Sequence, residues 1–259
     1  MDEQHLMNDD EFERNYKIES TYWWNVGRFK IIESFTRRYI KPSPRDRMVD
    51  LGCGTGATTS WLLKFGKIKG VDSSSKALAY CKKRGLKDLT LSDMEKLKLP
   101  SHSFDAAFAL DILEHVKNDQ KAIAEIYRIL KPGGRLLVTS PAYQWLWSEH
   151  DEVCHHQRRY TLSQIVGQLN AAGFEVQRKS YCIVFPFFPL VALIHFRSWF
   201  KKDKKIMMSI VPLPALFNQA LIFLLGMESF LLRFFDTPFG VSVICLAQKP
   251  LQTIRLKKG

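Results

Sequence analysis

The sequence has few cysteines and no spacing that pairs them. Five cysteines are scattered over 259 residues, and an odd, dispersed set is not a disulfide framework, which favours a reducing compartment. The first residues, MDEQHLMNDDEFER, lack the apolar run of a secretory signal. Internal repeats and low-complexity segments are absent as well. We therefore expect a cytoplasmic globular protein, and 46% apolar residues are enough for a substantial core.

A long uninterrupted apolar run is also missing. The stretch 183–194 contains Pro186 and Pro189 and is well short of the roughly 20 apolar residues that a membrane span needs. A longer stretch, 206–235, is interrupted by Asn218, Gln219, Glu228 and Arg233. At about 100° per residue its polar residues Asn218, Gln219, Ser229, Arg233 and Asp236 share one arc. We predict a helix here that is buried in a core or lies in a membrane interface.

Acidic residues are outnumbered by basic ones. The formal net charge is +12, which favours an anionic partner. Nucleic acid, anionic lipid head groups and phosphorylated substrates all fit this charge.

Short apolar runs alternate with helical patterns along the chain. Predicted strands occupy 48–51, 68–71, 89–91, 104–110, 135–139, 174–185 and 241–248. Predicted helices occupy 8–41, 58–65, 75–84, 118–130, and a segment from the capping box at 161–164 to Gly173. Such alternation predicts an α/β fold, with helices on both faces of a parallel sheet.

Glycines and carboxylates gather where these predicted strands end. Gly52, Gly54 and Gly56 follow the first strand and open a helix, so the backbone can turn sharply and approach a ligand closely. Asp72 ends the next strand, where a carboxylate can accept both hydroxyls of a ribose. A tight turn without a ligand, or a dinucleotide enzyme, would share these features.

Four segments resemble, in order, the motifs of class I methyltransferases that use S-adenosylmethionine. They are VDLGCGTGATT, GVDSSSKAL, SFDAAFALDILEHV and LKPGGRLLVTSPA. The resemblance covers roughly residues 49 to 185 and the last strand. It implies a Rossmann-like seven-stranded sheet whose last strand is antiparallel, with S-adenosylmethionine as the cofactor.

The resemblance also implies roles for individual residues. Asp50 and the backbone of the glycine loop would hold the methionine part of the cofactor, and Asp72 the ribose. Asp93, with Met94, would face the adenine; a turn residue after a short strand is the alternative for Asp93. The full set of expected cofactor contacts is Trp24, Arg28, Asp50, Gly52, Cys53, Gly54, Gly56, Asp72, Ser73, Asp93, Met94, Leu110 and Asp111.

The N-terminal segment resembles a lid found in some family members. Tyr22, Trp23 and Trp24 would form an aromatic wall, and Arg28 would pair with the cofactor carboxylate. Alternatively, the tryptophans only anchor this helix on the core.

The loop at 140–161 is rich in reactive side chains. His150, Asp151, Cys154, His155 and His156 suggest a metal site, but neighbouring residues rarely converge on one ion, so we expect no metal. A His-x-x-Arg-Tyr-Thr pattern resembles one in related methyltransferases. It implies substrate-side or loop-fixing roles, which we extend to His115 and Tyr143; the substrate set is His115, Tyr143, Arg159 and Tyr160. His150 or His156 is the candidate general base.

The expected division of the chain has four parts. Residues 1–47 form an N-terminal helical lid, 48–185 with 241–250 the cofactor-binding core, 186–240 a helical apolar insertion between strands six and seven, and 251–259 a basic tail. The insertion should roof the substrate pocket. Its Lys201, Lys202, Lys204 and Lys205, with Trp199 and Phe200, would meet an anionic membrane.

We therefore expect a methyltransferase for a small-molecule or lipid-linked acceptor, peripheral at the inner face of the membrane. An apolar lid or a homodimer interface serving a soluble substrate is the alternative for the insertion. A nucleic-acid methyltransferase is an alternative that the charge suggests, but Leu110-Asp111-Ile112-Leu113 stands where an Asn/Asp-Pro-Pro-aromatic motif would be. A non-catalytic membrane-associated module with the same fold is a further alternative.

Overall fold

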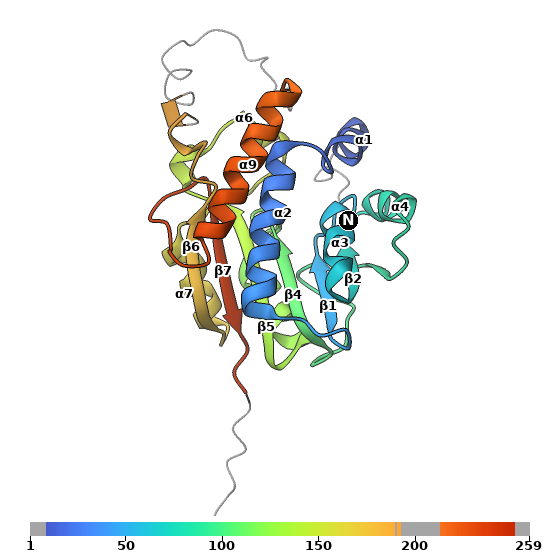
Figure 1. Cartoon of the computed structure of the whole chain (residues 1–259). Helices are drawn as coiled ribbons and strands as arrows, with labels where there is room; N and C mark the ends of the chain where they lie inside the picture. Colours follow the sequence, from blue (N-terminus) through green and yellow to red (C-terminus); the bar gives the residue numbers. More distant parts are fainter. Residues whose placement is uncertain (1–8, 190, 193–212, 252–259) are drawn as a thin grey trace, which may run out of the picture.

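The computed structural model describes residues 9–189, 191–192 and 213–251. Its centre is a seven-stranded sheet in the order β3-β2-β1-β4-β5-β7-β6 (Figure 1). The strands are β1 (Arg47–Leu51), β2 (Lys67–Asp72), β3 (Leu89–Leu91), β4 (Phe104–Leu110), β5 (Leu130–Pro141), β6 (Glu175–Cys182) and β7 (Ser242–Gln248). Strand β7 runs antiparallel to β5 and β6, whereas the pairs among β1 to β5 are parallel. The predicted Rossmann-like sheet with an antiparallel last strand is confirmed.

Helices cover both faces of the sheet (Figure 1). They are α1 (Asp9–Ile18), α2 (Trp23–Phe35), η2 (Thr36–Ile40), α3 (Ala57–Leu62), η3 (Leu63–Phe65), α4 (Ser75–Lys83), α5 (Asp119–Ile129), η4 (Gln144–Leu146), α6 (Glu149–Val153), α7 (Leu162–Ala171) and α9 (Ala215–Leu231). The capping box predicted for α7 is present, because Gln164 accepts the Thr161 N–H at 2.8 Å while the Thr161 hydroxyl accepts the Gln164 N–H. No helix among the described residues is long and apolar enough to cross a membrane.

Alternating side chains of the central strands build two apolar layers. On β4, Ala107 and Ala109 belong to the layer shared with α5 and α7. Phe108 and Leu110 point to the other layer, which α2 and α9 cover. This period of two is what a strand buried on both faces requires.

The N-terminal segment departs from its prediction. A single helical stretch was expected over 8–41, but the structure has two helices with a break between Ile18 and Trp23. Asn218 of α9 explains the break: its amide accepts the Trp23 N–H at 2.9 Å and donates to the Thr21 carbonyl at 3.0 Å. This tertiary contact occupies backbone groups that a continuous helix would pair internally.

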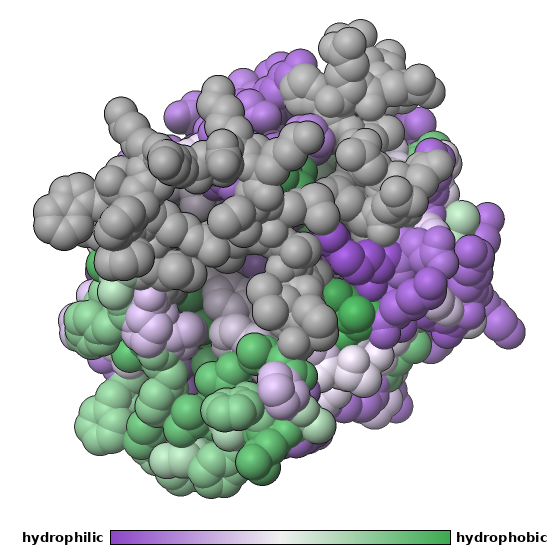
Figure 2. Space-filling model, turned by 90° about the horizontal axis from the view of Figure 1, so that it is seen from above, coloured by the Kyte–Doolittle hydropathy of each residue, from purple (hydrophilic) through white to green (hydrophobic). Residues whose placement is uncertain are grey.

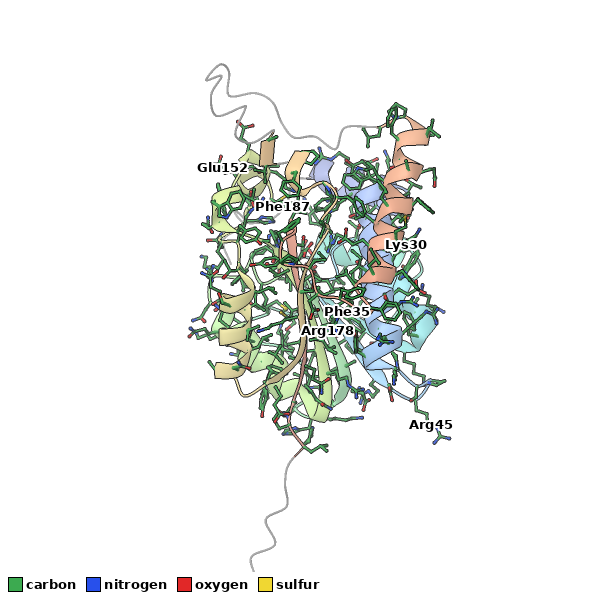
Figure 3. The ribbon with its side chains drawn as sticks, turned by 60° about the vertical axis from the view of Figure 1, so that its left-hand side comes forward. Lys30, Phe35, Arg45, Glu152, Arg178 and Phe187 are labelled. Carbon is green, nitrogen blue, oxygen red and sulfur yellow. The ribbon has the colours of Figure 1, made fainter. Side chains whose placement is uncertain are left out.

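Helices α2 and α9 lie side by side, with Lys30 of α2 beside α9 in Figure 3. They approach closely at Gly27, where a Cβ atom would lie 2.1 Å from Leu225 Cδ1. Ser229 donates to the Lys30 carbonyl at 2.8 Å, and Arg233 donates to the Ser34 hydroxyl at 3.0 Å. Polar residues of the predicted arc therefore face α2.

Candidate active site

The glycine loop joins β1 to α3 and leaves open space in front of it. Gly52, Gly54 and Gly56 all have positive φ angles of 74°, 53° and 89°, which side chains rarely tolerate. The Gly52 and Cys53 N–H groups bond the Val71 carbonyl and so fix the loop against β2. A Cβ atom on Gly54 would meet nothing within 4 Å. The loop therefore fits a ligand that approaches the backbone closely.

Asp72 ends β2 beside this loop. Its carboxylate accepts the N–H groups of Gly54 and Ser74, both at 2.9 Å, and the backbone of Ser73 contributes a further bond. Burial raises the pKa of Asp72 despite these bonds. The carboxylate lies where the resemblance puts a ribose, and ribose binding by Asp72 stays a prediction.

Asp50 is buried beneath the glycine loop. The Thr59 hydroxyl donates to its carboxylate at 2.6 Å. Burial, with the nearby Asp72 charge, raises the pKa of Asp50 to about 7. A cationic group above the loop would favour its ionised form, which fits the α-ammonium of a bound methionine moiety.

Glu19, just after α1, makes a contact that the sequence did not predict. The Glu19 carboxylate accepts the hydroxyl of Thr55 in the glycine loop. Arg84 holds Glu19 at 2.6 Å and donates to the Thr55 carbonyl at 2.8 Å. An N-terminal residue thus lies against the cofactor loop, as a lid would. A carboxylate at a helix end gives no sequence signal for this role.

Asp93 follows β3 and accepts the Glu95 N–H at 2.8 Å, so it forms the turn that the alternative interpretation predicted. Its side chain is exposed, while Met94 is buried in the core. A role toward adenine stays a prediction for both residues.

Arg28 reaches from α2 to the end of β4. Its guanidinium pairs with the Asp111 carboxylate at 2.6 Å, whereas the expected partner was the cofactor carboxylate. The Thr139 hydroxyl donates to the other oxygen of Asp111 at 2.7 Å. Leu110 is buried beside them, and Trp24 packs against the same core. Arg28 and Asp111 therefore join α2 to the end of β4, and Leu110 and Trp24 belong to the apolar layer on that face of the sheet.

The loop after β5 is organised by Asp151, which is fully buried. Its carboxylate binds His156 Nδ1 at 2.8 Å and accepts two bonds from Arg159, at 2.7 and 2.8 Å. Burial alone would raise the pKa of Asp151, but these partners and Ser148 outweigh it and lower the pKa well below its usual value. His156 and Arg159 are thus loop-fixing here. The sequence analysis missed this role; the spacing of Ser148 and Asp151 is that of a capping box, but it does not indicate burial of the carboxylate.

The two predicted tyrosines lie apart. Tyr160 is buried, and its hydroxyl donates to Asp119 at 2.7 Å. Tyr143 stacks on Tyr181, with ring centroids 4.8 Å apart, and lies against Trp145 and Phe187. Tyr160 therefore supports the loop from beneath, while Tyr143 belongs to an aromatic cluster.

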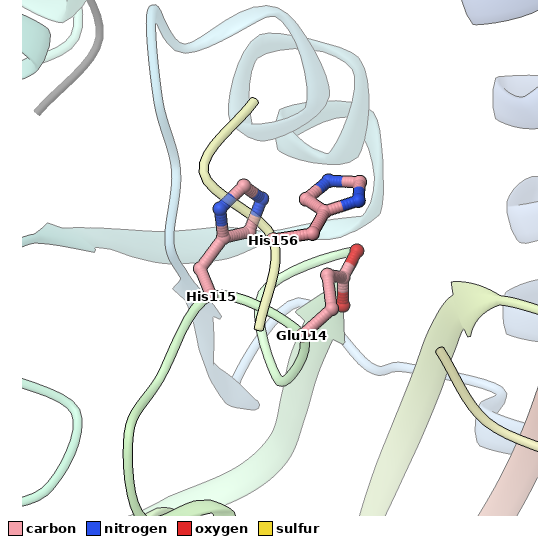
Figure 4. A group of neighbouring side chains, drawn as sticks. All are labelled: Glu114, His115 and His156. Atoms are coloured by element: carbon pink, nitrogen blue, oxygen red, sulfur yellow. The ribbon is translucent and has the colours of Figure 1, made fainter. Parts of the chain in front are cut away.

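Glu114, His115 and His156 meet in front of β4 and β5 (Figure 4). Atoms able to bind a metal, one from each residue, lie within 4.8 Å of one another. Burial, and next the neighbouring His156, lower the pKa of His115 to about 4. Burial, then the Asp111 charge, raise the pKa of Glu114 well above its usual value. His150 lies outside this group, with its Nε2 atom 3.6 Å from Cys154 Sγ.

Comparisons with known proteins agree with this geometry. Residues 49–138 match the family model described as "Methyltransferase domain". The sterol 24-C-methyltransferase ERG6B of Gibberella zeae is 30% identical over 154 residues, covering 56% of this chain and 40% of that protein. The chain spans about 40% of the length of the first curated relatives it matches.

Solved structures share the fold. The complex of the Haloferax volcanii Trm112 methyltransferase activator and its putative methyltransferase contains a chain with a TM-score of 0.61 and 16% identity, covering 95% of this chain and 96% of that one. Phosphoethanolamine N-methyltransferase 2 of Haemonchus contortus, in complex with S-adenosyl-L-methionine, matches with a TM-score of 0.56 and 22% identity, over 85% of this chain and 52% of that one.

The sheet order, the glycine loop with Asp72 at the next strand end, and the family match all point the same way. Residues 49–138 form a methyltransferase domain, set in the seven-stranded sheet of the class I S-adenosylmethionine-dependent methyltransferase fold.

Proposed function

We propose that this enzyme transfers a methyl group from S-adenosylmethionine to a lipid-linked acceptor at an anionic membrane surface. The observation that carries the proposal is the orientation of α9. Asn218 and Ser229 bond the segment around α2, whereas many of the large apolar side chains of α9 are exposed. A surface helix of a water-soluble protein normally has the reverse arrangement.

Three polar residues of α9 make hydrogen bonds within the protein. Asn218 and Ser229 bond the backbone of the segment around α2. Glu228 is buried, and its carboxylate accepts the N–H groups of Ile183 and Val184 at 2.5 and 2.9 Å. These contacts fix the rotation of the helix about its axis, so the outward apolar face is a property of the fold.

The outward face is large and aromatic. Its exposed residues on α9 and just after it are Leu216, Phe217, Phe223, Met227, Phe230, Leu231, Phe234 and Phe235. Leu216 is 80% exposed and Phe223 65% exposed. Figure 2 shows apolar side chains gathered on the side of the molecule where α9 lies. A contiguous exposed apolar patch of this kind marks an interaction site.

Cations border this apolar face. The Arg38 guanidinium lies 5.7 Å from the Phe234 ring centre, and Arg233 lies 5.6 Å from that of Phe230. Lys30 reaches the Ile222 carbonyl of α9. An apolar face bordered by cations complements an anionic lipid surface. The aromatic rings can insert among the acyl chains, and the cations can pair with the anionic head groups. The predicted lysines at 201–205 lie outside the described residues.

Aromatic side chains connect this region to the loop after β5. Phe188 is exposed and contacts Phe187, with ring centres 5.3 Å apart. Phe187 in turn contacts Tyr143 and Trp145 of the loop. This row leads from the surface toward the carboxyl ends of the strands, where cofactor and acceptor would meet.

The bound cofactor supplies a methyl group already activated on a sulfonium. The protein then has to position the acceptor and exclude water. The aromatic cluster around Tyr143 excludes water. The Asp151 network holds in place the loop that contains Tyr143. The name of the Gibberella zeae relative, a sterol methyltransferase, supports a lipid class of acceptor.

Vesicle flotation tests the membrane surface. A variant with Phe217, Phe223, Phe230 and Phe234 changed to Ser should lose binding to anionic vesicles, and added salt should weaken binding of the unaltered protein. Leu63→Ser/Leu91→Ser is the matched control, because both leucines are exposed on other elements. Lys201/Lys202/Lys204/Lys205→Glu extends the test to the predicted basic cluster.

A dimer interface serving a soluble substrate is the competing function of this face. That alternative predicts a protein that stays out of the vesicle fraction and elutes as a dimer, which disperses when Leu224 and Leu231 are made polar. Mass spectrometry of lipid and metabolite extracts incubated with isotopically labelled cofactor would separately identify the acceptor. Label confined to small polar metabolites would contradict the lipid-linked acceptor.

A further inference from the structure

Three potential metal ligands converge from two separate loops. Glu114 and His115 lie just after β4, and His156 lies in the loop after β5. Because β4 and β5 are parallel neighbours, both loops leave from the same edge of the sheet. The rings of His115 and His156 meet edge to face with centroids 4.6 Å apart, and Glu114 lies beside them (Figure 4).

Each histidine is held in a way that suits a ligand. Asp151 binds His156 at Nδ1, so the Nε2 atom is left as the coordinating nitrogen. Asp151 is itself fully buried and clamped by Arg159. A carboxylate that orients the far nitrogen is the usual support of a metal-bound imidazole. His115 has a backbone hydrogen bond with Cys154, which restrains the second ring.

Glu114 supplies an independent indication of a ligand. Its side chain is fully buried, and its Oε2 atom accepts the Ser140 hydroxyl at 2.9 Å. Its Oε1 atom is buried without a hydrogen-bond partner among the described residues. A buried polar atom left unpaired costs free energy. A cation between this oxygen and the two imidazoles would satisfy it.

We propose that Glu114, His115 and His156 form a binding site for a divalent transition-metal cation of the zinc class. Two imidazoles and one carboxylate suit Zn²⁺, whereas Mg²⁺ and Ca²⁺ prefer oxygen ligands alone. Ligands about 2.1 Å from a tetrahedral zinc lie roughly 3.4 Å apart. Binding therefore draws the three groups together from their present separation, and it leaves one coordination position open.

The proposed site differs from the one that the sequence suggested and set aside. That group consisted of neighbours within 150–156, and only His156 belongs to both. The two other ligands come from the segment after β4, which no local spacing connects to His156. Cation binding at this site does not depend on the identity of the acceptor, so the proposal and the proposed function fail or succeed separately.

Calorimetric titration of the chelator-treated full chain with Zn²⁺ tests the site. One equivalent should bind the unaltered protein. Glu114→Gln and His156→Gln should each weaken binding by more than about tenfold, the loss seen even for outer-shell partners of a metal. His155→Asn is the matched control: it removes an imidazole from the same loop, and Asn tolerates the φ of 55° at this position. It should bind Zn²⁺ like the unaltered protein.

Two readouts guard against misfolded variants. Circular dichroism should show the same secondary structure in every protein compared. In the unaltered protein alone, imidazole nitrogen NMR signals should shift on Zn²⁺ addition for two of the seven histidines. Absence of Zn²⁺ binding, binding that Glu114→Gln and His156→Gln leave unchanged, or shifts confined to other histidines would each overturn the proposal.

Discussion

The Arg28 guanidinium and the Asp111 carboxylate are 2.6 Å apart and join helix α2 to the end of β4. The pair is partly buried, with 18% and 23% of the two side chains exposed. It connects the N-terminal segment to the carboxyl end of β4, where the resemblance to class I methyltransferases predicts the cofactor. Helix α2 is therefore held to the end of β4 by an ion pair as well as by apolar packing.

This ion pair should make a measurable contribution to folding. In a double-mutant cycle of Arg28→Ala and Asp111→Asn, we expect a coupling of about 1 kcal/mol, at the upper end of exposed pairs because burial is partial. Urea unfolding of the four proteins measures it. The exposed pair Glu13–Lys17 is the matched control and should couple more weakly. Additive losses for Arg28 and Asp111 would show that the pair is not coupled.

Asp72→Ala should weaken binding of S-adenosylmethionine by roughly 1–3 kcal/mol, the cost of leaving polar ligand groups unpaired. Isothermal titration calorimetry measures the change. Asp88→Ala serves as the control. Asp88 is an exposed carboxylate that pairs with Lys69 of β2, the strand that Asp72 ends. Unchanged affinity in Asp72→Ala would remove this carboxylate from the cofactor site.

Asp50 should make the stability of the cofactor-free protein depend on pH. Its pKa is raised from 3.8 to about 7 in the fold, so folding favours the protonated form. The stabilising contribution of the proton is therefore fully present below about pH 4 and is lost as the pH rises to about 7. Asp50→Asn has no titrating group at this position. The free energy of unfolding of the variant, relative to that of the unaltered protein, should therefore rise between pH 5 and pH 8.

Urea unfolding of both proteins at pH 5 and pH 8 measures this stability difference. The contributions of the other titrating groups cancel, because both proteins contain them. A stability difference between the two proteins that stays constant with pH would contradict the raised pKa of Asp50. Binding of the cationic cofactor at pH 7 should also release protons, which calorimetry in buffers of different ionisation enthalpy detects.

Asp151→Asn should destabilise the loop after β5. The substitution leaves the buried Arg159 guanidinium without its carboxylate partner, and breaking such a pair costs roughly 3 kcal/mol. Hydrogen exchange at 148–159 should accelerate more than exchange in β4. Asp105→Asn, which removes the partner of the more exposed Lys131, is the control. Equal protection in both variants would argue against Asp151 as the organiser of this loop.

The strands along the chain could be predicted from their short apolar runs, and the antiparallel last strand from the resemblance to class I methyltransferases. The rotation of α9 could not, since a polar arc on a helix usually marks the solvent side. Here Ser229 and Asn218 bond α2 instead. Only the tertiary structure shows which face has a partner.

The arrangement of the glycine loop and Asp72 could be predicted from the sequence, whereas that of the loop after β5 could not. The glycine loop follows β1 and Asp72 ends β2, and the predicted parallel sheet brings these two strand ends together. The Asp151 network also spans only a few residues, but nothing in the sequence says that its carboxylate is buried. Glu114 and His156 meet only because β4 and β5 are neighbours in the sheet.

Glu228 binds backbone rather than side chains. Its carboxylate accepts N–H groups of Ile183 and Val184, and every amino acid except proline provides such a group. This contact therefore leaves the side chains at 183 and 184 free to vary while forbidding proline at either position. Divergent sequences could keep α9 anchored here without any detectable pattern beyond one acidic residue in an apolar helix.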